Sequence, residues 1–178
     1  MEADWEFEVA ADAPVIDQAW AGFVDLRNSP QRAMELPEAA QVSGIAETLK
    51  RLNSPASPVW TSKCDAWEPE EFDPDELDAD HDKATRAIAI YIDLLPAEPD
   101  AWSTLHNIAG WCRSLCARLR ERPLRGCRVD LVIRRSAGSA EQAELGITAY
   151  VVACGPDPAG AGKILSSALC ALADAVAG

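Results

Sequence analysis

Residues 86–95 read Arg-Ala-Ile-Ala-Ile-Tyr-Ile-Asp-Leu-Leu, which is the longest run of β-branched and other apolar residues in the chain. A run of this kind is typical of a strand that is buried on both faces. A second run, from Cys127 to Arg135, has the same character, with Val-Asp-Leu-Val-Ile near its centre. We therefore expect these two strands to lie in the core of a sheet around which the other elements are arranged.

The rest of the chain shows strand and helix patterns in turn. Residues 5–9 alternate apolar and acidic side chains, as expected of an edge strand with one wet face. Further elements are predicted as strands at 59–67 and 146–154 and as helices at 14–27, from Pro37 to about 52, at 100–122 and after Asp157. The predicted order is β-α-α-β-β-α-β-β-α. This order indicates an α+β two-layer sandwich, in which a mainly antiparallel five-stranded sheet carries helices on one face.

The length and composition predict one globular domain over residues 1–178, because 48% of the 178 residues are hydrophobic. Residues 65–82 differ from the rest, since they contain ten Asp and Glu residues and no Lys or Arg. Their mutual repulsion and the prolines at 69 and 74 predict an acidic, solvated connection between two paired strands.

The charge balance indicates which classes of partner the protein can bind. With 16 Lys and Arg against 29 Asp and Glu, the net charge is −13, which opposes binding to nucleic acid or to anionic lipid. The arginines between Arg113 and Arg135 are not accompanied by a glycine-aromatic RNA motif, so they do not change this expectation. We expect the partner to be another protein, and a homodimer is one such case. We do not expect binding to a membrane. No basic leader or long apolar run is seen, which predicts a cytoplasmic protein.

The six cysteines mostly lie within apolar, periodic segments, which predicts that they are reduced. Cys112 and Cys116 are four residues apart and would project from one side of a helix, as two ligands of a thiolate metal site would. Both belong to the apolar stripe of that helix, where free cysteine acts as a small hydrophobic residue. We therefore predict neither a metal site nor a cofactor.

Three residues are candidates for catalysis. Asp93 and Asp130 lie in the centres of the two most apolar strands, where a carboxyl group requires an explanation. On neighbouring strands they would form a general acid/base pair. The favoured alternative is an open, polar sheet face with Asp130 in ion pairs with arginines. Cys64, next to Lys63, is the third candidate, as a nucleophile whose base is not evident from the sequence.

Binding candidates cluster around the acidic connection. Trp60 and Trp67 flank it, and tryptophan is common at interface hot spots. The acidic candidates are Asp73, Asp75, Asp78 and Asp80. Together these features favour a protein-binding module of the adaptor, chaperone or inhibitor type, and not an enzyme. The alternative is a small-molecule enzyme with a carboxylate or cysteine site on the sheet face. The chain is similar in size, acidity and terminal β-β-α unit to bacterial secretion chaperones, a likeness of class that carries no single residue over.

Residues 155–163, Gly-Pro-Asp-Pro-Ala-Gly-Ala-Gly-Lys, lie between a predicted strand and a predicted helix, which is the setting of a phosphate loop. Asp157 stands where that motif requires Gly, and Ile164 stands where it requires Ser or Thr. We therefore predict that Asp157 caps the final helix.

Overall fold

The computed structural model describes residues 1–18, 20–138 and 144–178, and its centre is a mixed sheet of six strands. In order across the sheet, the main strands are β1 (Glu2–Glu8), β5 (Cys127–Ala137), β6 (Leu145–Gly155), β4 (Arg86–Pro96) and β3 (Val59–Trp67). The short β2 (Ile16–Asp17) also pairs with β5. Both β1 and β2 run parallel to β5, whereas the other neighbours are antiparallel. The predicted α+β class is confirmed, and the prediction of a mainly antiparallel, five-stranded sheet is wrong.

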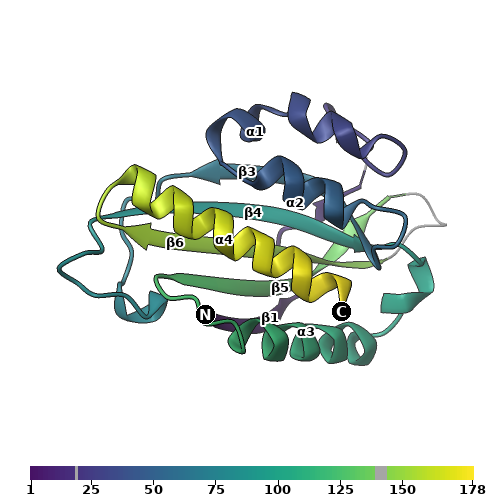
Figure 1. Ribbon diagram of the computed structural model, residues 1–178. Helices are drawn as coiled ribbons and strands as arrows, with labels where there is room; N and C mark the ends of the chain where they lie inside the picture. Colours follow the sequence, from purple (N-terminus) through teal and green to yellow (C-terminus); the bar gives the residue numbers. More distant parts are fainter. Residues whose placement is uncertain (19, 139–143) are drawn as a thin grey trace.

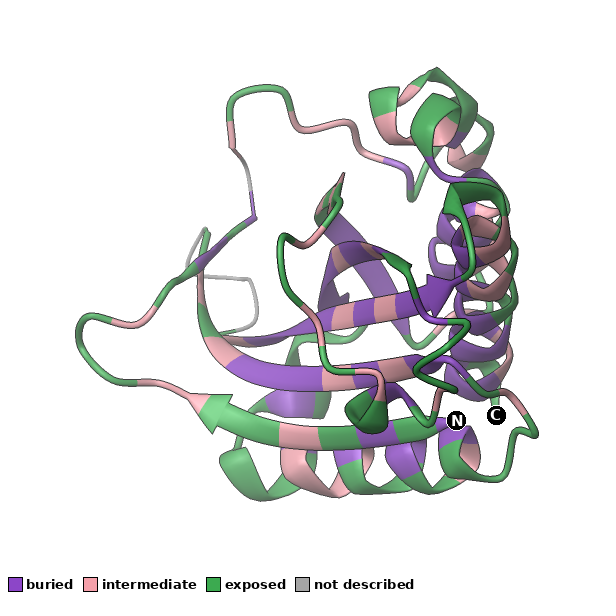
Figure 2. Ribbon diagram, turned by 90° about the vertical axis from the view of Figure 1, so that its left-hand side faces the viewer, coloured by how far each residue is buried: buried purple, intermediate pink, exposed green. Residues whose placement is uncertain are grey.

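Helices cover one face of this sheet (Figure 1). The long α4 (Pro158–Ala177) lies across β6 and β4, with α2 (Ile45–Leu52) beside it, and α3 (Leu105–Arg120) lies along β1. A short α1 (Pro37–Gln41) precedes α2. Figure 2 shows the buried residues gathered on the strands and on the helix sides that face them. The main core therefore lies between the sheet and the helices.

Three short 3₁₀ helices complete the described elements, at η1 (Pro30–Glu35), η2 (Asp75–Leu77) and η3 (Pro99–Trp102). The single helix expected after Pro37 is divided in two, because Gly44 has a φ of 89° at the start of α2. The predicted cap of the last helix is confirmed: the Asp157 carboxylate accepts a hydrogen bond of 2.7 Å from the Gly160 amide.

The helix predicted at 14–27 is wrong. Ile16 and Asp17 form β2 instead, and the described residues after them, up to Arg27, are turns and irregular chain. The apolar spacing has another cause, because Ile16 packs with Trp60 and Leu95 in a small cluster on the sheet face that the helices leave free. These side chains follow the sheet surface, not the stripe of a helix.

α4 is the one helix in the described part of the chain that is long and apolar enough to cross a membrane, in contrast to the sequence expectation. Half of the apolar stretch of α4 is buried inside the protein. Leu165, Leu169 and Leu172 of α4 are fully buried in the main core. The apolar character of α4 is thus used in packing against the sheet.

The acidic segment 65–82 is more than a solvated connection. Residues 65–67 belong to β3, and Leu77 of η2 is buried in a small cluster with Ala87 and Cys154. Arg125 donates two hydrogen bonds to the Asp78 carboxylate, at 2.8 and 2.9 Å. One buried leucine and one ion pair therefore fix the middle of this segment to the sheet.

Candidate functional site

The centre of β4 faces an irregularity in β3. The register between the two strands shifts between Thr61 and Cys64. As a result, Ser62 and Lys63 together stand opposite Asp93. Such a β-bulge bends a strand and re-aims its side chains, and bulges are over-represented next to active sites. This bulge brings an ammonium group and a carboxyl group to the same part of the helix-free sheet face.

Asp93 is only 7% exposed. Its Oδ1 accepts a hydrogen bond of 2.7 Å from the Thr148 hydroxyl on neighbouring β6. Among the described residues, Oδ2 has no hydrogen-bond partner. Burial raises the pKa of Asp93 above its ordinary value, although the Thr148 hydrogen bond and the charges of Arg134 and Lys63 lower it. Asp93 is therefore a buried carboxyl group that holds its proton more tightly than usual and has one oxygen left unpartnered.

Arg134 on β5 connects this carboxyl group to the edge of the sheet. Its Nη1 donates to the Thr148 hydroxyl at 3.3 Å and to the Tyr150 hydroxyl at 3.1 Å. Its Nε and Nη2 donate to Glu8 of β1 at 3.1 and 2.7 Å. Because the side chain is 14% exposed, Glu8 compensates a largely buried charge. A hydrogen-bonded network thus runs from β1 through β5 and β6 to Asp93 on β4.

Aromatic rings lie beside this network. Tyr91 and Tyr150 face each other on β4 and β6, with ring centroids 6.2 Å apart. Trp67 lies 6.3 Å from the first ring and 6.4 Å from the second. The ammonium group of Lys63 is 5.9 Å from the Tyr91 ring and 5.6 Å from the Trp20 ring, within the range of cation–π attraction. The site therefore combines charged groups with flat apolar surfaces.

These groups line a cavity of about 360 Å³, which we call the Asp93 cavity. Residues 14–17 and Trp20 form its other wall, and the Ser62 hydroxyl holds that wall by donating to the Asp17 carbonyl at 2.6 Å. The sheet contributes Lys63, Tyr91, Asp93, Arg134, Thr148 and Tyr150. The volume lies within the usual range for small-molecule pockets, about 300 to 1,000 Å³.

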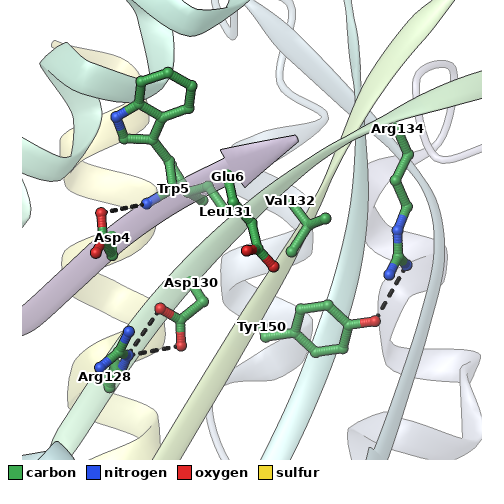
Figure 3. Close-up of a pocket in the computed structure, with 9 residues that line it drawn as sticks. All are labelled: Asp4, Trp5, Glu6, Arg128, Asp130, Leu131, Val132, Arg134 and Tyr150. Atoms are coloured by element: carbon green, nitrogen blue, oxygen red, sulfur yellow. Dashed lines mark hydrogen bonds and ion pairs between the residues drawn. The ribbon is translucent and has the colours of Figure 1, made fainter. Parts of the chain in front are cut away.

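A second hollow, of about 390 Å³, lies next to the Asp93 cavity and shares Arg134 and Tyr150 with it (Figure 3). In this hollow, Arg128 Nε donates to both oxygens of Asp130 at 2.8 Å. Because β6 lies between β5 and β4, Asp130 and Asp93 are not on neighbouring strands. Strand spacing and rise place their Cα atoms roughly 12 Å apart. The acid/base pair is therefore wrong, and the ion-pair alternative describes Asp130.

Cys64 lies on the other side of β3, against the core beneath the helices. Burial raises the pKa of its thiol to about 12, and the nearby carboxylates of Glu38, Asp65 and Asp93 act in the same direction. The thiolate is the nucleophilic form of cysteine, and it is scarce at neutral pH when the pKa is this high. Cys64 is thus neither in the Asp93 cavity nor activated.

The cysteines should therefore differ in their rate of alkylation. Cys170 is exposed, Cys64 is intermediate, and the other four are buried. In the folded protein at about pH 8, we expect iodoacetamide to modify Cys170 first and the buried cysteines only after unfolding. Peptide mass spectrometry over time measures this order. Modification of Cys64 as fast as that of Cys170 would contradict a protonated, shielded thiol.

The two tryptophans predicted as surface anchors have different surroundings. Trp60 is 6% exposed, its Nε1 donates to the Pro96 carbonyl at 3.1 Å, and the Arg27 guanidinium lies 4.2 Å above its ring. It is therefore not a surface anchor, because the β2 segment and β4 cover it. Trp67 is 41% exposed and lies at the rim of the aromatic group described above.

All four acidic binding candidates have partners within the chain, three in ion pairs and one in a hydrogen bond to the backbone. Asp75 contacts His81 at 2.9 Å, and Asp80 contacts Lys83 at 3.2 Å. Asp78 is held by Arg125, as described above. Asp73 accepts a hydrogen bond of 2.9 Å from the Asp75 amide. These carboxylates therefore stabilise the local fold of the segment, in addition to carrying negative charge.

Cys112 and Cys116 are fully buried in the main core. Burial raises the pKa of Cys112 to about 12 and that of Cys116 to about 11, so both thiols are protonated at neutral pH. Within the described residues, no group of three or more His, Cys, Asp or Glu side chains is placed to hold a metal ion. Both cysteines serve as packing residues.

Sequence reasoning identified Asp93 but missed the residues that surround it. Thr148, Arg134 and Lys63 come from three different strands, and only the strand order and the bulge bring them together. One signal was present, because the side chains of Tyr150 and Thr148 interrupt the apolar run of β6 at alternate positions. In an otherwise apolar strand, that spacing marks one polar face.

One fold supports many functions, so the side chains of a site indicate function more directly than the fold does. Comparisons of the chain with protein-family models, with curated proteins and with solved structures find no match.

Proposed function

We propose that this protein binds a small, polar organic molecule in the Asp93 cavity. The observation that carries the proposal is the state of Asp93, a buried carboxyl group with one unpartnered oxygen beside the charged groups of Lys63 and Arg134. A pocket with a few convergent polar groups and a perturbed pKa is the usual setting of a ligand site.

A purely structural role explains Asp93 less well. Burying a carboxyl group is unfavourable unless hydrogen bonds satisfy it. Thr148 satisfies Oδ1, whereas Oδ2 has no described partner and is not fully buried, which leaves it accessible from the cavity that Asp93 lines. If position 93 served packing alone, an apolar residue would suffice. On the other face of the same strand, Ile88, Ile90 and Ile92 fill that role in the main core. A ligand that donates to Oδ2 would complete the network.

The raised pKa of Asp93 adds a chemical capacity. A carboxyl group that holds its proton nearer to neutral pH can accept a proton from a bound molecule or donate one to it. The Thr148 hydroxyl fixes the orientation of this carboxyl group, and Arg134 fixes the orientation of Thr148. Binding and proton exchange would therefore take place at the same atom, Oδ2.

A thermal-shift screen against a library of small polar metabolites tests the proposal. We expect at least one compound to raise the melting temperature of the wild type, because binding to the folded state stabilises it. The shift should disappear in Asp93→Asn, because the Asn side chain is neutral and cannot replace a carboxylate as the hydrogen-bond acceptor for the ligand. Asp130→Asn is the matched control, since Asp130 lies on the same sheet face outside the Asp93 cavity. Equal shifts in wild type and Asp93→Asn would contradict the proposal.

The protein-binding function expected from composition remains a second proposal. It is favoured by the row of Glu2, Asp4 and Glu6, whose side chains are exposed along β1. A basic partner attracted by such a row would bind more weakly as salt increases, over a Debye length of about 8 Å at physiological ionic strength. Capture that does not depend on salt would contradict steering by these carboxylates.

A further inference from the structure

We propose that the Asp93 cavity selects amphoteric molecules, with an amino group bound by Asp93 and a carboxylate bound by Lys63, so that free amino acids are its ligand class. This inference rests on the proposed function and deepens it. It is carried by the juxtaposition of two oppositely charged side chains across the β3 bulge, which form no ion pair with each other or with another described residue.

Lys63 supplies the site for an anion. Among the described residues, its ammonium group takes part in no ion pair, and its neighbours are the rings of Trp20 and Tyr91. The Tyr91 hydroxyl next to it raises the pKa of Lys63, so the ammonium group stays charged at neutral pH. The Tyr91 hydroxyl accepts from one of the three N–H groups of this ammonium, which leaves the others available to a ligand carboxylate.

Arg134 cannot take this role. Each of its three guanidinium nitrogens already donates to a protein oxygen, on Glu8, Thr148 or Tyr150. A ligand carboxylate would have to displace Glu8 from a largely buried ion pair. Arg134 is therefore a positioning residue, which holds Thr148 and, through it, Asp93.

Asp93 supplies the site for a hydrogen-bond donor. It stands opposite Lys63 in the register, yet the two side chains do not form an ion pair with each other. A molecule that donates from an ammonium group to Asp93 Oδ2 and accepts from Lys63 Nζ would bridge this gap. Two opposite charges close together on the ligand are the defining feature of an α-amino acid.

Size and shape agree with this class. A cavity of about 360 Å³ is at the lower end of the range for organic ligands. The rings of Tyr91, Tyr150 and Trp20 line the same cavity and offer flat surfaces for an apolar or aromatic side chain. The polar groups would fix the backbone of the amino acid while the rings contact its side chain.

The test combines changes in the protein with changes in the probe. Each of the standard amino acids is titrated into the wild type by calorimetry, and the best binder is compared with the amine that lacks its carboxylate and the acid that lacks its amino group. For L-phenylalanine these probes are phenethylamine and 3-phenylpropionate. The variants are Lys63→Met and Asp93→Asn, with Lys83→Met and Asp130→Asn as controls, because the controls remove the same charges outside the cavity.

We expect Lys63→Met to weaken binding of the amino acid by about tenfold or more while leaving binding of the amine unchanged, because one charge-assisted hydrogen bond is lost. Asp93→Asn should weaken the amino acid similarly and leave the acid unchanged. Equal effects of either variant on all three probes would overturn the assignment of groups. If no amino acid binds at about 10 mM, a concentration at which even millimolar affinity is detected, the ligand class is wrong. Metabolite shifts in the library screen that depend on Asp93 would then still support the proposed function.

Discussion

Replacing Arg134 by Met should lower the free energy of unfolding by about 2 to 4 kcal/mol, because the change removes the charged centre of a largely buried network. Glu8 loses its ion-pair partner, and the hydroxyls of Thr148 and Tyr150 lose a donor. Asp93 also loses a nearby positive charge that favours its ionised form. For a chain of this length, the melting temperature should fall by roughly 5 to 15 °C.

Arg128→Met is the matched control for this change, since both arginines lie on β5 and face the same side of the sheet. Arg128 is 31% exposed, and its one ion-pair partner within the described residues is Asp130, so its loss should change stability by about 0 to 1 kcal/mol. Urea unfolding of both variants measures the difference. Equal destabilisation by the two substitutions would show that Arg134 is not the centre of a buried network.

Replacing Asp93 by Asn should raise the stability of the ligand-free protein at neutral pH, by about 0.5 to 2 kcal/mol, as is common when a strained functional residue is removed. The raised pKa of Asp93 means that the folded protein binds its proton more tightly than the unfolded chain does. This tighter proton binding stabilises the folded protein. The stabilisation is fully present below pH 3.8, the ordinary pKa of Asp, and is lost as pH rises through the pKa of Asp93 in the folded protein.

The gain in stability from Asp93→Asn should therefore grow as pH rises from about 4 to 7. It should vanish at low pH, where Asp93 is protonated in both the folded and the unfolded protein. Neighbouring groups that titrate near Asp93 are Lys63 and Tyr91, and both keep their protons across this range, since the pKa of each is raised. Melting temperatures measured along this pH range check the result. A loss of stability at neutral pH would indicate that ionised Asp93 stabilises the fold and is structural.

Long apolar patterns predicted the α+β class and the inner strands of the sheet, and short-range chemistry predicted parts of the site. The runs at 86–95 and 127–135 are central strands because apolar strands buried on a helix-covered face need such composition. Asp157 was identified as a cap from its position before Pro158. Asp93 was noticed because a carboxyl group within an apolar strand requires an explanation.

The remaining features depend on contacts that are distant in the sequence. Residues 14–27 have helical spacing, but Ile16 and Phe23 pack on the sheet face next to Trp60, whereas Leu26 is buried in the main core. The parallel pairing of β1 with β5 joins residues more than 120 positions apart, as the Glu8 to Arg134 contact shows. The β3 bulge contains no glycine or proline to signal it. Without strand order and bulge, Lys63 could not be placed opposite Asp93.

The most direct test of the central claim is a map of where small polar molecules contact the protein. Amide and tryptophan indole NMR signals of the wild type are recorded with and without the compounds that shift its melting temperature. We predict that the signals of Asp93, Thr148 and Tyr150, which do not line the neighbouring cavity beside Leu36, change together, and that these changes are absent in Asp93→Asn. Changes centred on Leu36 and Leu49, whose cavity shares Trp20 and Lys63 with the Asp93 cavity but does not include Asp93 or Thr148, would contradict the assignment of the Asp93 cavity as the binding site.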